Sequence, residues 1–367
     1  MNTRPLKTVE VPPLLTAMIG ACVLLLTPAF VLGQLPEIRY GSEVPPEVKM
    51  MYERGLEFLS RTQQEDGAWP GGDNGSGITG MGLMAFLANG EDPNFGRYQL
   101  QIQRAVRSII RSQNASTGYI SQSMYHHGFA MLGLAEAYGA VDETLLWDGQ
   151  AGGQAGGRGA RAGLGGQRSI GAALELAVRS SVTSQKRNQF GAWRYSPESN
   201  DADTSVSGAV LVGLLAARNA GIEVPDECID KALAYYQSMT AANGAVGYSG
   251  GAASGGSMNP PAIATLVYSI GKRKDSTQFT AASKYIVSNM QNMQNSYPEY
   301  YRYYMSQALF QSDFEAWGKW KRENTALLRT LQQEDGSFNA GHGKAYGTSM
   351  SLLSLALDYR FLPIYER

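Results

Sequence analysis

The sequence predicts an all-α protein, an (α/α)6 toroid of six helical hairpins, and two kinds of repetition support this prediction. The first is a loop: the segment 63–69, Gln-Gln-Glu-Asp-Gly-Ala-Trp, recurs at 332–338 as Gln-Gln-Glu-Asp-Gly-Ser-Phe, and a third copy ends in Gly-Ala-Trp at Trp193. Each loop follows a stretch with apolar residues at helical spacing, and Asp-Gly or Gly ends that stretch. Almost no stretch alternates in the way that a strand does.

The second repetition lies in the helices that follow these loops. Three of them open with threonine, a small residue, an apolar residue and another small residue, at Thr79, Thr204 and Thr348. The loop glycine precedes that threonine by 12, 13 and 12 positions. A phase kept over three copies indicates a repeat protein in which each unit is one helical hairpin.

The hairpins can be followed along the chain. We expect units at 48–90, 101–139, 168–221, 224–272, about 280–309 and 317–357, which together place the toroid at 48–358. A glycine-rich stretch at 148–167 cannot hold a helix or strand and is expected to form a surface loop. Residues 359–367 are expected to form a short tail.

Paired helices stack either into an open solenoid or into a closed ring. We expect closure, because the first and last units are the most alike and neither has the polar outer face of an end repeat. The second helices are rich in small residues and are expected to form the inner ring. The first helices, such as 105–111, have one charged face and are expected to form the outer ring.

The N-terminus has the layout of a targeting segment, with Arg4 and Lys7 followed by an apolar run at 14–32. We interpret 1–33 as an export signal cleaved before Gln34, as an uncleaved membrane anchor, or as a lipoprotein signal acylated at Cys22. Each alternative places the body outside the cytoplasm, secreted, periplasmic or anchored to a membrane. The proline-containing segment 34–47 is expected to be an extended tether.

Composition excludes several classes. A hydrophobic content of 43% with 17% charged residues is typical of a packed domain and not of a disordered chain. The formal net charge of -1 provides no electrostatic footprint for nucleic acid. Only Cys228 remains beyond the leader, so no disulfide within the mature chain is expected.

The first loop and its helix match a known signature. They contain Arg-Gly, Phe-Leu, Gln and a final Gly-Ala-Trp at positions 54–55, 58–59, 63 and 67–69. This pattern resembles the QW repeat of squalene-hopene and oxidosqualene cyclases, and thereby the terpene cyclase/protein prenyltransferase superfamily. The resemblance covers residues 48–358 and implies the α/α toroid fold. Pectate lyases with a similar toroid are an alternative relation at the level of the fold.

The same resemblance implies chemistry. Triterpene cyclases protonate their substrate with the central acid of an Asp-x-Asp-Asp motif, and Asp201-Ala202-Asp203-Thr204 is similar to it, with Thr204 in place of the last acid. Prenyltransferases of the superfamily use one ring and a zinc ion held by Asp, Cys and His. No cysteine here lies at the start of an inner helix, and His342 stands alone in the last loop, so we expect no metal and no cofactor.

The starts of the inner helices are expected to meet at one mouth of the ring. At the start of each inner helix, two positions are expected to face this mouth: 78–79, 126–127, 203–204, 260–261, 302–303 and 347–348. From this mouth we predict a catalytic group of Asp203, Asp201 and His126. We predict substrate contacts from His127, Thr204, Trp193, Tyr301, Arg302, Tyr304 and Tyr346. The alternative for Asp203 and Thr204 is helix capping, and for the histidines and tyrosines it is packing.

Two functions are compatible with these features. In the first, an exported toroid binds an isoprenoid-like apolar molecule in its centre, or cyclises it as a terpene cyclase-like isomerase or lyase. In the second, a non-catalytic toroid is a scaffold that binds a protein or a glycan partner. Asp203 and a histidine facing one cavity would favour the first function, whereas Asp203 directed into a helix end would favour the second.

Overall fold

A computed structural model describes residues 44–70, 75–147, 167–251, 257–291, 297–359 and 361–365. The chain divides into two compact units, 1–39 and 40–367, and the helices below all belong to the second unit. The predicted leader, most of the predicted tether and nearly all of the glycine-rich stretch lie outside the described residues. Within the described part of the chain, no helix is both long enough and apolar enough to span a membrane.

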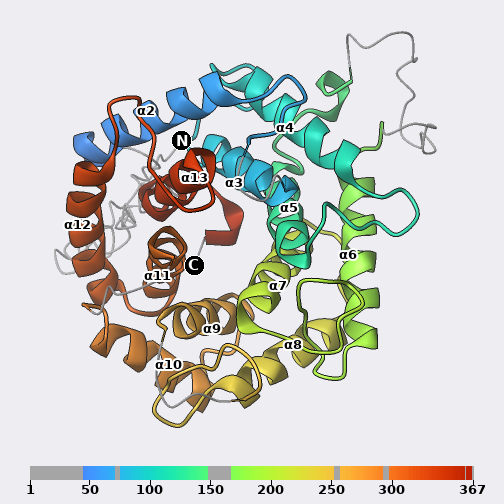
Figure 1. Cartoon of the computed structure of the whole chain (residues 1–367), viewed down its shortest axis with the longest axis vertical. Helices are drawn as coiled ribbons and strands as arrows, with labels where there is room; N and C mark the ends of the chain where they lie inside the picture. Colours follow the sequence, from blue (N-terminus) through green and yellow to red (C-terminus); the bar gives the residue numbers. More distant parts are fainter. Residues whose placement is uncertain are drawn as a thin grey trace, which may run out of the picture. The chain divides into compact units, whose positions relative to one another are not determined.

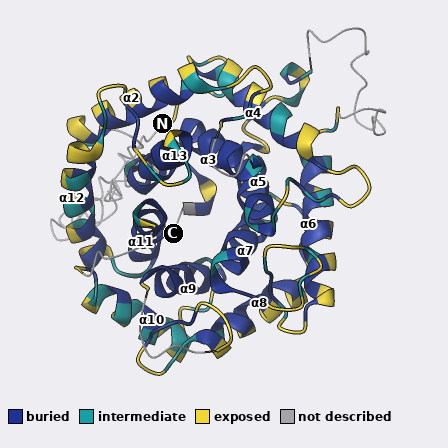
Figure 2. Ribbon diagram, viewed as in Figure 1, coloured by how far each residue is buried: buried dark blue, intermediate teal, exposed yellow. Residues whose placement is uncertain are grey.

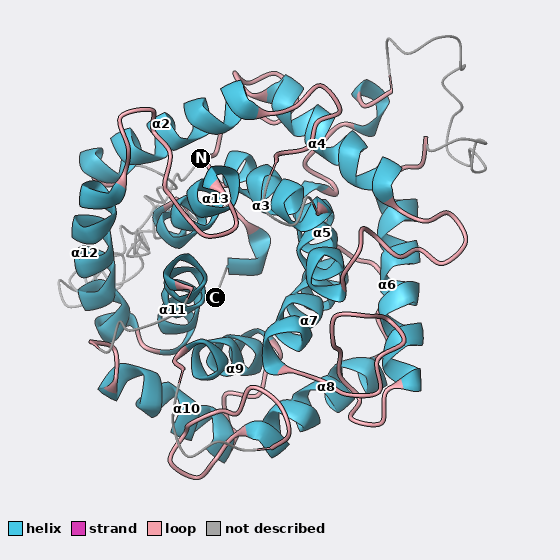
Figure 3. Cartoon of the chain, viewed as in Figure 1, coloured by secondary structure: helices cyan, strands magenta, loops and turns pink. Residues whose placement is uncertain are grey.

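Twelve α-helices alternate between two concentric rings in the described part of this unit (Figure 1, Figure 3). The outer ring contains α2 (Pro46–Thr62), α4 (Gln99–Ser112), α6 (Ile170–Arg187), α8 (Asp226–Met239), α10 (Thr277–Ser288) and α12 (Phe314–Leu331). The inner ring contains α3 (Ser76–Leu87), α5 (Met124–Ala137), α7 (Thr204–Asn219), α9 (Asn259–Ile270), α11 (Pro298–Ser312) and α13 (Lys344–Leu355). The predicted (α/α)6 toroid is confirmed.

The composition of each helix explains its ring. The inner helices are buried on nearly all sides, whereas the outer helices bury one face and expose the other (Figure 2). Small residues bring inner helices into backbone contact: a Cβ added to Gly128 of α5 would lie 2.5 Å from the backbone of Ala209 in α7. A Cβ added to Gly133 of α5 would lie 2.9 Å from the backbone of Gly80 in α3. Only glycine permits such close approach.

A glutamine at the end of an outer helix joins one hairpin to the next. The Nε2 of Gln63 donates to Gly67 O in its own loop (3.1 Å) and to Gln101 O in α4 (2.9 Å). The same paired bonds recur from Gln113 to Gly118 and Ala173, from Gln185 to Gly191 and Cys228, and from Gln332 to Gly336 and Met51. The last of these joins the loop after α12 to α2, and α13 packs against α2 and α3. The ring is therefore closed by the same pair of bonds that connects α2 to α4, α4 to α6 and α6 to α8.

The loop aromatics complete this joint. Trp69 is buried and its indole N–H donates to Leu59 O at 2.7 Å. Trp193 repeats the arrangement, with its indole N–H donating to Ser181 O at 2.9 Å. Each of these loops is therefore tied by its tryptophan to a backbone carbonyl of its own outer helix.

The C-terminal segment enters the ring (Figure 1). The 3-10 helices η2 (Ala356–Asp358) and η3 (Pro363–Tyr365) follow α13, with Leu362 and Ile364 buried. Phe361 lies against Gly90, just beyond the end of α3, and η3 packs against α7. This segment occupies the end of the hollow where the inner helices finish, so the other end is where a ligand can enter.

Candidate functional site: a tyrosine-lined cavity

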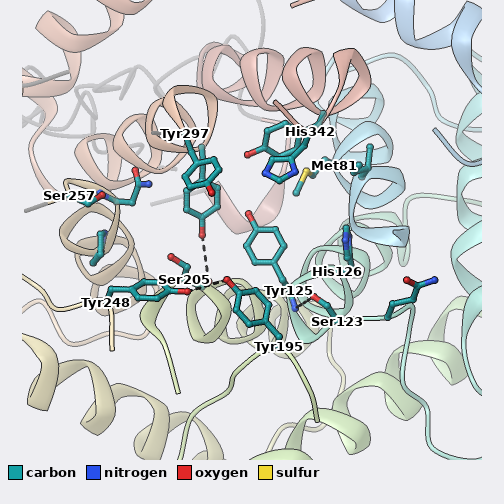
Figure 4. A pocket seen from close by; sticks show the side chains of 16 residues that line it. Met81, Ser123, Tyr125, His126, Tyr195, Ser205, Tyr248, Ser257, Tyr297 and His342 are labelled. Carbon is teal, nitrogen blue, oxygen red and sulfur yellow. Dashed lines mark hydrogen bonds between the residues drawn. The ribbon is translucent and has the colours of Figure 1, made fainter. Parts of the chain in front are cut away.

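A cavity of about 970 Å³ opens at the end of the ring where the inner helices begin (Figure 4). Six of its described lining residues are tyrosines: Tyr125, Tyr195, Tyr248, Tyr297, Tyr300 and Tyr346. The polar lining is completed by Gln122, Ser123, His126, Ser205, Ser257, Asn259 and His342, and the apolar lining by Ile78, Met81 and Pro260. The described part of this lining contains no Asp, Glu, Lys or Arg. The volume is that of a small-molecule site.

Two sources supply these side chains. The first turns of the inner helices supply Ile78, His126 and Pro260, as predicted, and Ser205 from α7. The same helices also supply Met81, Tyr125, Asn259, Tyr300 and Tyr346, and the loops that precede the inner helices supply the rest, such as Tyr195 and Tyr248. The site is therefore assembled from all six hairpins at one end of the ring.

The floor of the cavity is an aromatic cluster centred on Tyr125, which projects into the cavity in Figure 4. The ring of Tyr125 lies 5.1 Å from that of Phe129 and 5.9 Å from that of Tyr300, measured between centroids. Tyr300 in turn lies 4.7 Å from Tyr304. Burial raises the pKa of Tyr125 and of Tyr300 well above the usual tyrosine value. Their hydroxyls therefore stay protonated and neutral, able both to donate and to accept hydrogen bonds.

The rim carries three exposed tyrosines. Tyr195, Tyr248 and Tyr297 are 51%, 42% and 52% exposed, respectively. The hydroxyls of Tyr195 and Tyr248 lie 3.1 Å apart, within hydrogen-bonding distance. On the opposite side of the mouth, Tyr297 stacks on His342 with 5.8 Å between ring centroids and 19° between planes. Aromatic faces thus border the entrance on two sides.

Asp203, the predicted acid, lies behind the cavity wall. It is the N-cap of α7, fully buried, and its Oδ1 accepts from the Val206 amide at 2.7 Å. Its Oδ2 lies 3.4 Å from Nε of Arg194, which also pairs with the exposed Asp201 at 3.1 Å. Burial raises the pKa of Asp203, and the Val206 amide and Arg194 oppose that rise. The geometry thus gives Asp203 the capping role that was the alternative in the sequence, and neither aspartate is among the described lining residues.

The two histidines at the start of α5 separate. His126 lines the cavity, packed against Gly75 and Gly77 of the neighbouring hairpin. His127 is fully buried on the other side of the helix, where its Nδ1 accepts from the Ile120 amide at 3.0 Å. The predicted position at the cavity is therefore in place for His126, and His127 instead packs against the outer ring.

Of the other predicted contacts, only Tyr346 lines the cavity. Thr204 is buried and its hydroxyl donates to Gly247 O at 3.1 Å. Tyr301 packs edge-on against Trp320 of α12, and Arg302 forms a buried ion pair with Glu299 at 3.7 Å. Tyr304 lies beneath Tyr300 and Trp193 lies in its loop, as described above. Helix rotation turns Tyr301 and Arg302 away from the cavity, whereas Trp193 is bound to its own outer helix.

Sequence reasoning missed the loop residues of the rim. Tyr195, Tyr248 and His342 precede an inner helix by different numbers of residues, so no repeat marks them. The usable signal was residue type: tyrosines in glycine- and serine-rich loops beside the mouth. Within the described residues, no three His, Cys, Asp or Glu side chains lie close enough together to hold a metal ion.

No protein-family model and no curated protein matches the sequence. Solved structures do match it. An inactive variant of the α-1,6-mannanase GH76A of Salegentibacter sp. HEL1_6, in complex with α-1,6-mannotriose, has a TM-score of 0.59 at 8% identity, covering 86% of this chain and 99% of that one. A protein from Actinoplanes has a TM-score of 0.50 at 12% identity, covering 85% and 99%. The type II terpene cyclase MstE from Scytonema has a TM-score of 0.33 at 14% identity, covering 86% and 99%. At these identities the first two similarities establish the fold alone.

Proposed function

We propose that the protein is a non-catalytic toroid that binds a neutral, hydroxyl-rich ligand, an oligosaccharide, in its tyrosine-lined cavity. The observation that carries the proposal is the lining itself: six tyrosines with serine, asparagine, glutamine and histidine, and no Asp, Glu, Lys or Arg among the described residues. A sugar ring offers an apolar C–H face that packs on an aromatic ring, and hydroxyls that pair with neutral donors and acceptors. The predicted export signal, with its apolar run at 14–32, would place this glycan-binding site outside the cytoplasm.

Among the residues that the structure describes at this site, the reacting groups of two catalytic alternatives are not found. Glycoside hydrolysis commonly uses two carboxyl groups flanking the scissile bond, and the described lining carries none. Cyclisation of an isoprenoid needs an acid that faces the substrate, and Asp203 is instead engaged as the cap of α7. The aromatic floor under Tyr125 nevertheless favours isoprenoid binding as a second candidate, because stacked aromatic faces suit an apolar chain.

The test is ligand binding to the full chain, measured by saturation-transfer NMR. The oligosaccharide arm is a panel of neutral oligosaccharides that begins with α-1,6-mannotriose, and the isoprenoid arm is geranylgeraniol. We expect binding in the oligosaccharide arm and its loss in Tyr297→Ala, an exposed rim change that leaves the core intact. Binding of geranylgeraniol alone would support the second candidate, and no binding by any oligosaccharide would refute the first.

A matched control is available on the same helix as the floor tyrosine. Tyr125 lies in the first turn of α5, and Tyr138 is the residue at its C-terminal end, 38% exposed. The two positions are about 20 Å apart along the axis at 1.5 Å per residue. Tyr125→Phe should weaken oligosaccharide binding by removing one hydroxyl, whereas Tyr138→Phe should leave it unchanged. Equal effects of the two changes would show that the cavity is not the binding site.

A further inference from the structure

The Asp-x-Asp segment and the rim tyrosines are connected by one side chain, Arg194. Its Cζ lies 5.6 Å from the ring centroid of Tyr195 and 5.7 Å from that of Tyr248. These are cation–π distances, so a single guanidinium faces both rings of the pair. Arg194 is not among the described residues that line the cavity, and its side chain is 26% exposed. It therefore supports the rim from behind.

Arg194 is itself held by the two aspartates. Its terminal nitrogen lies 3.1 Å from Asp201 Oδ2 and its Nε lies 3.4 Å from Asp203 Oδ2. Asp203 is fixed in place, because its other oxygen caps α7 and its amide donates to Trp193 O at 3.1 Å. The guanidinium is therefore held in place by a residue at the buried start of α7. A planar cation with several donors can pair with two carboxylates and face two rings at once, which a lysine ammonium cannot do.

The backbones of the two tyrosines are fixed independently of Arg194. Tyr195 O accepts from the Met124 amide at the start of α5, at 2.8 Å. Tyr248 O accepts from the Thr204 amide at the start of α7, at 2.9 Å. The rings, unlike the backbones, are exposed, and their hydroxyls lie 3.1 Å apart. The Asp203 carboxylate interacts with the Tyr248 hydroxyl as well as with Arg194, and the guanidinium faces both rings.

We propose that Arg194 is a positioning residue that sets the orientation of Tyr195 and Tyr248 as a two-ring clamp for the ligand, with Asp203 and Asp201 as its anchors. The proposal deepens the proposed function and rests on it for the nature of the ligand: the clamp presents two aromatic faces to an oligosaccharide at the mouth. It gives the Asp-x-Asp segment a role in ligand binding without proton transfer. Arg194 acts through the tyrosines and does not touch the ligand.

The first readout needs no ligand. With 3-fluorotyrosine placed at position 248 of the full chain, the 19F resonance should shift or broaden in Arg194→Ala, because the cation beside the ring is removed. Asp203→Asn should act in the same direction, since asparagine keeps the cap but removes the charge that holds Arg194. Arg218→Ala is the matched control. This arginine lies in the last turn of α7, at the end opposite to Asp203, and pairs with the exposed Asp226 at 3.2 Å. It should leave the resonance unchanged.

The second readout is the affinity for α-1,6-mannotriose. Removing both cation–π interactions at this partly exposed site should weaken binding by about tenfold in Arg194→Ala, with Arg194→Lys recovering only part of the affinity. Unfolding midpoints of the variants, measured in parallel, exclude global unfolding as the cause. A resonance unaffected by Arg194→Ala would overturn the positioning role, and so would a shifted resonance with unchanged affinity. Absence of mannotriose binding in the unmodified protein would count against the proposed ligand, while the resonance would still decide whether Arg194 positions the rings.

Discussion

His127 should make the stability of the fold depend on pH, and replacing it with glutamine should remove that dependence. The imidazole is fully buried between α5 and α6. Its Nδ1 accepts from the Ile120 amide, which places the proton on Nε2, 3.0 Å from the hydroxyl of Ser181 and 3.2 Å from Ala177 O. A second proton on Nδ1 would face an N–H donor in a site without solvent. The neutral ring is therefore the form that the fold accepts.

The size of the effect follows from the pKa. Burial lowers the pKa of His127 from 6.5 to about 4, although the Ala177 carbonyl opposes the shift. The unfolded chain takes up a proton below about pH 6.5 and the folded protein does so only below about pH 4, so stability is complete above the first value and is lost between the two. At about 1.4 kcal/mol for each unit of difference, the full loss is about 3 kcal/mol, of which about 2 kcal/mol is lost by pH 5.

The assay is urea unfolding of the wild-type chain and of His127→Gln across this pH range. Glutamine does not titrate, so the difference in unfolding free energy between the two proteins isolates the histidine from the carboxylates that titrate in the same range. We expect that difference to shrink by about 2 kcal/mol between pH 7.5 and pH 5. A difference independent of pH would show that the ring has the same pKa in the folded and unfolded protein, as a solvent-accessible ring would, and would refute the burial argument.

Two further predictions concern the loops that join the hairpins. In Gly336→Ala the new Cβ would lie 2.3 Å from Arg54 O across the ring closure, at a φ of +85°, so we expect a loss above about 2 kcal/mol in urea unfolding. Gly221→Ala has a similar φ of +91° with no described atom within 4 Å, and should cost only about 1 kcal/mol; equal costs would contradict the contact. Gln332→Ala removes two hydrogen bonds and should cost about 2 kcal/mol, the same as Gln63→Ala within the ring. A much smaller cost at Gln332 would mean that the closing joint is weaker than the others.

The ring could be predicted because its information is local and repeated. The loop at 63–69 and its copy at 332–338 each carry a glutamine, a glycine and an aromatic residue that together end one outer helix and hold the next. One bond of each glutamine lies within its own loop and the other reaches the next hairpin at the same place in each repeat, so a repeated pattern in the sequence reports them. Closure could be predicted because the last loop resembles the first. Its glutamine, Gln332, bonds to the next outer helix as Gln63 does, and that next helix is α2.

The site was predicted only where helix starts stay in phase. His126 and Ile78 are both the third residues of their helices and both face the cavity. Asp203, although aligned with them by the repeat, precedes α7 as its cap, and Ser205 faces the cavity instead. Relative to the repeat, α7 begins three residues later than α3 and α5, so the aligned position is the N-cap in α7 and not the third helical residue.

What the sequence determined by itself was the number, order and closure of the hairpins, since each is specified by contacts between residues that a repeat keeps in register. The tertiary structure alone decided the chemistry of the mouth. Tyr195, Tyr248 and Tyr297 come from loops without a common period, and they meet because the ring brings the starts of its inner helices to one end. Arg194 shares one loop with Tyr195, Asp201 and Asp203, but Tyr248 comes from the loop of the next hairpin, so only the folded ring places both tyrosines beside it.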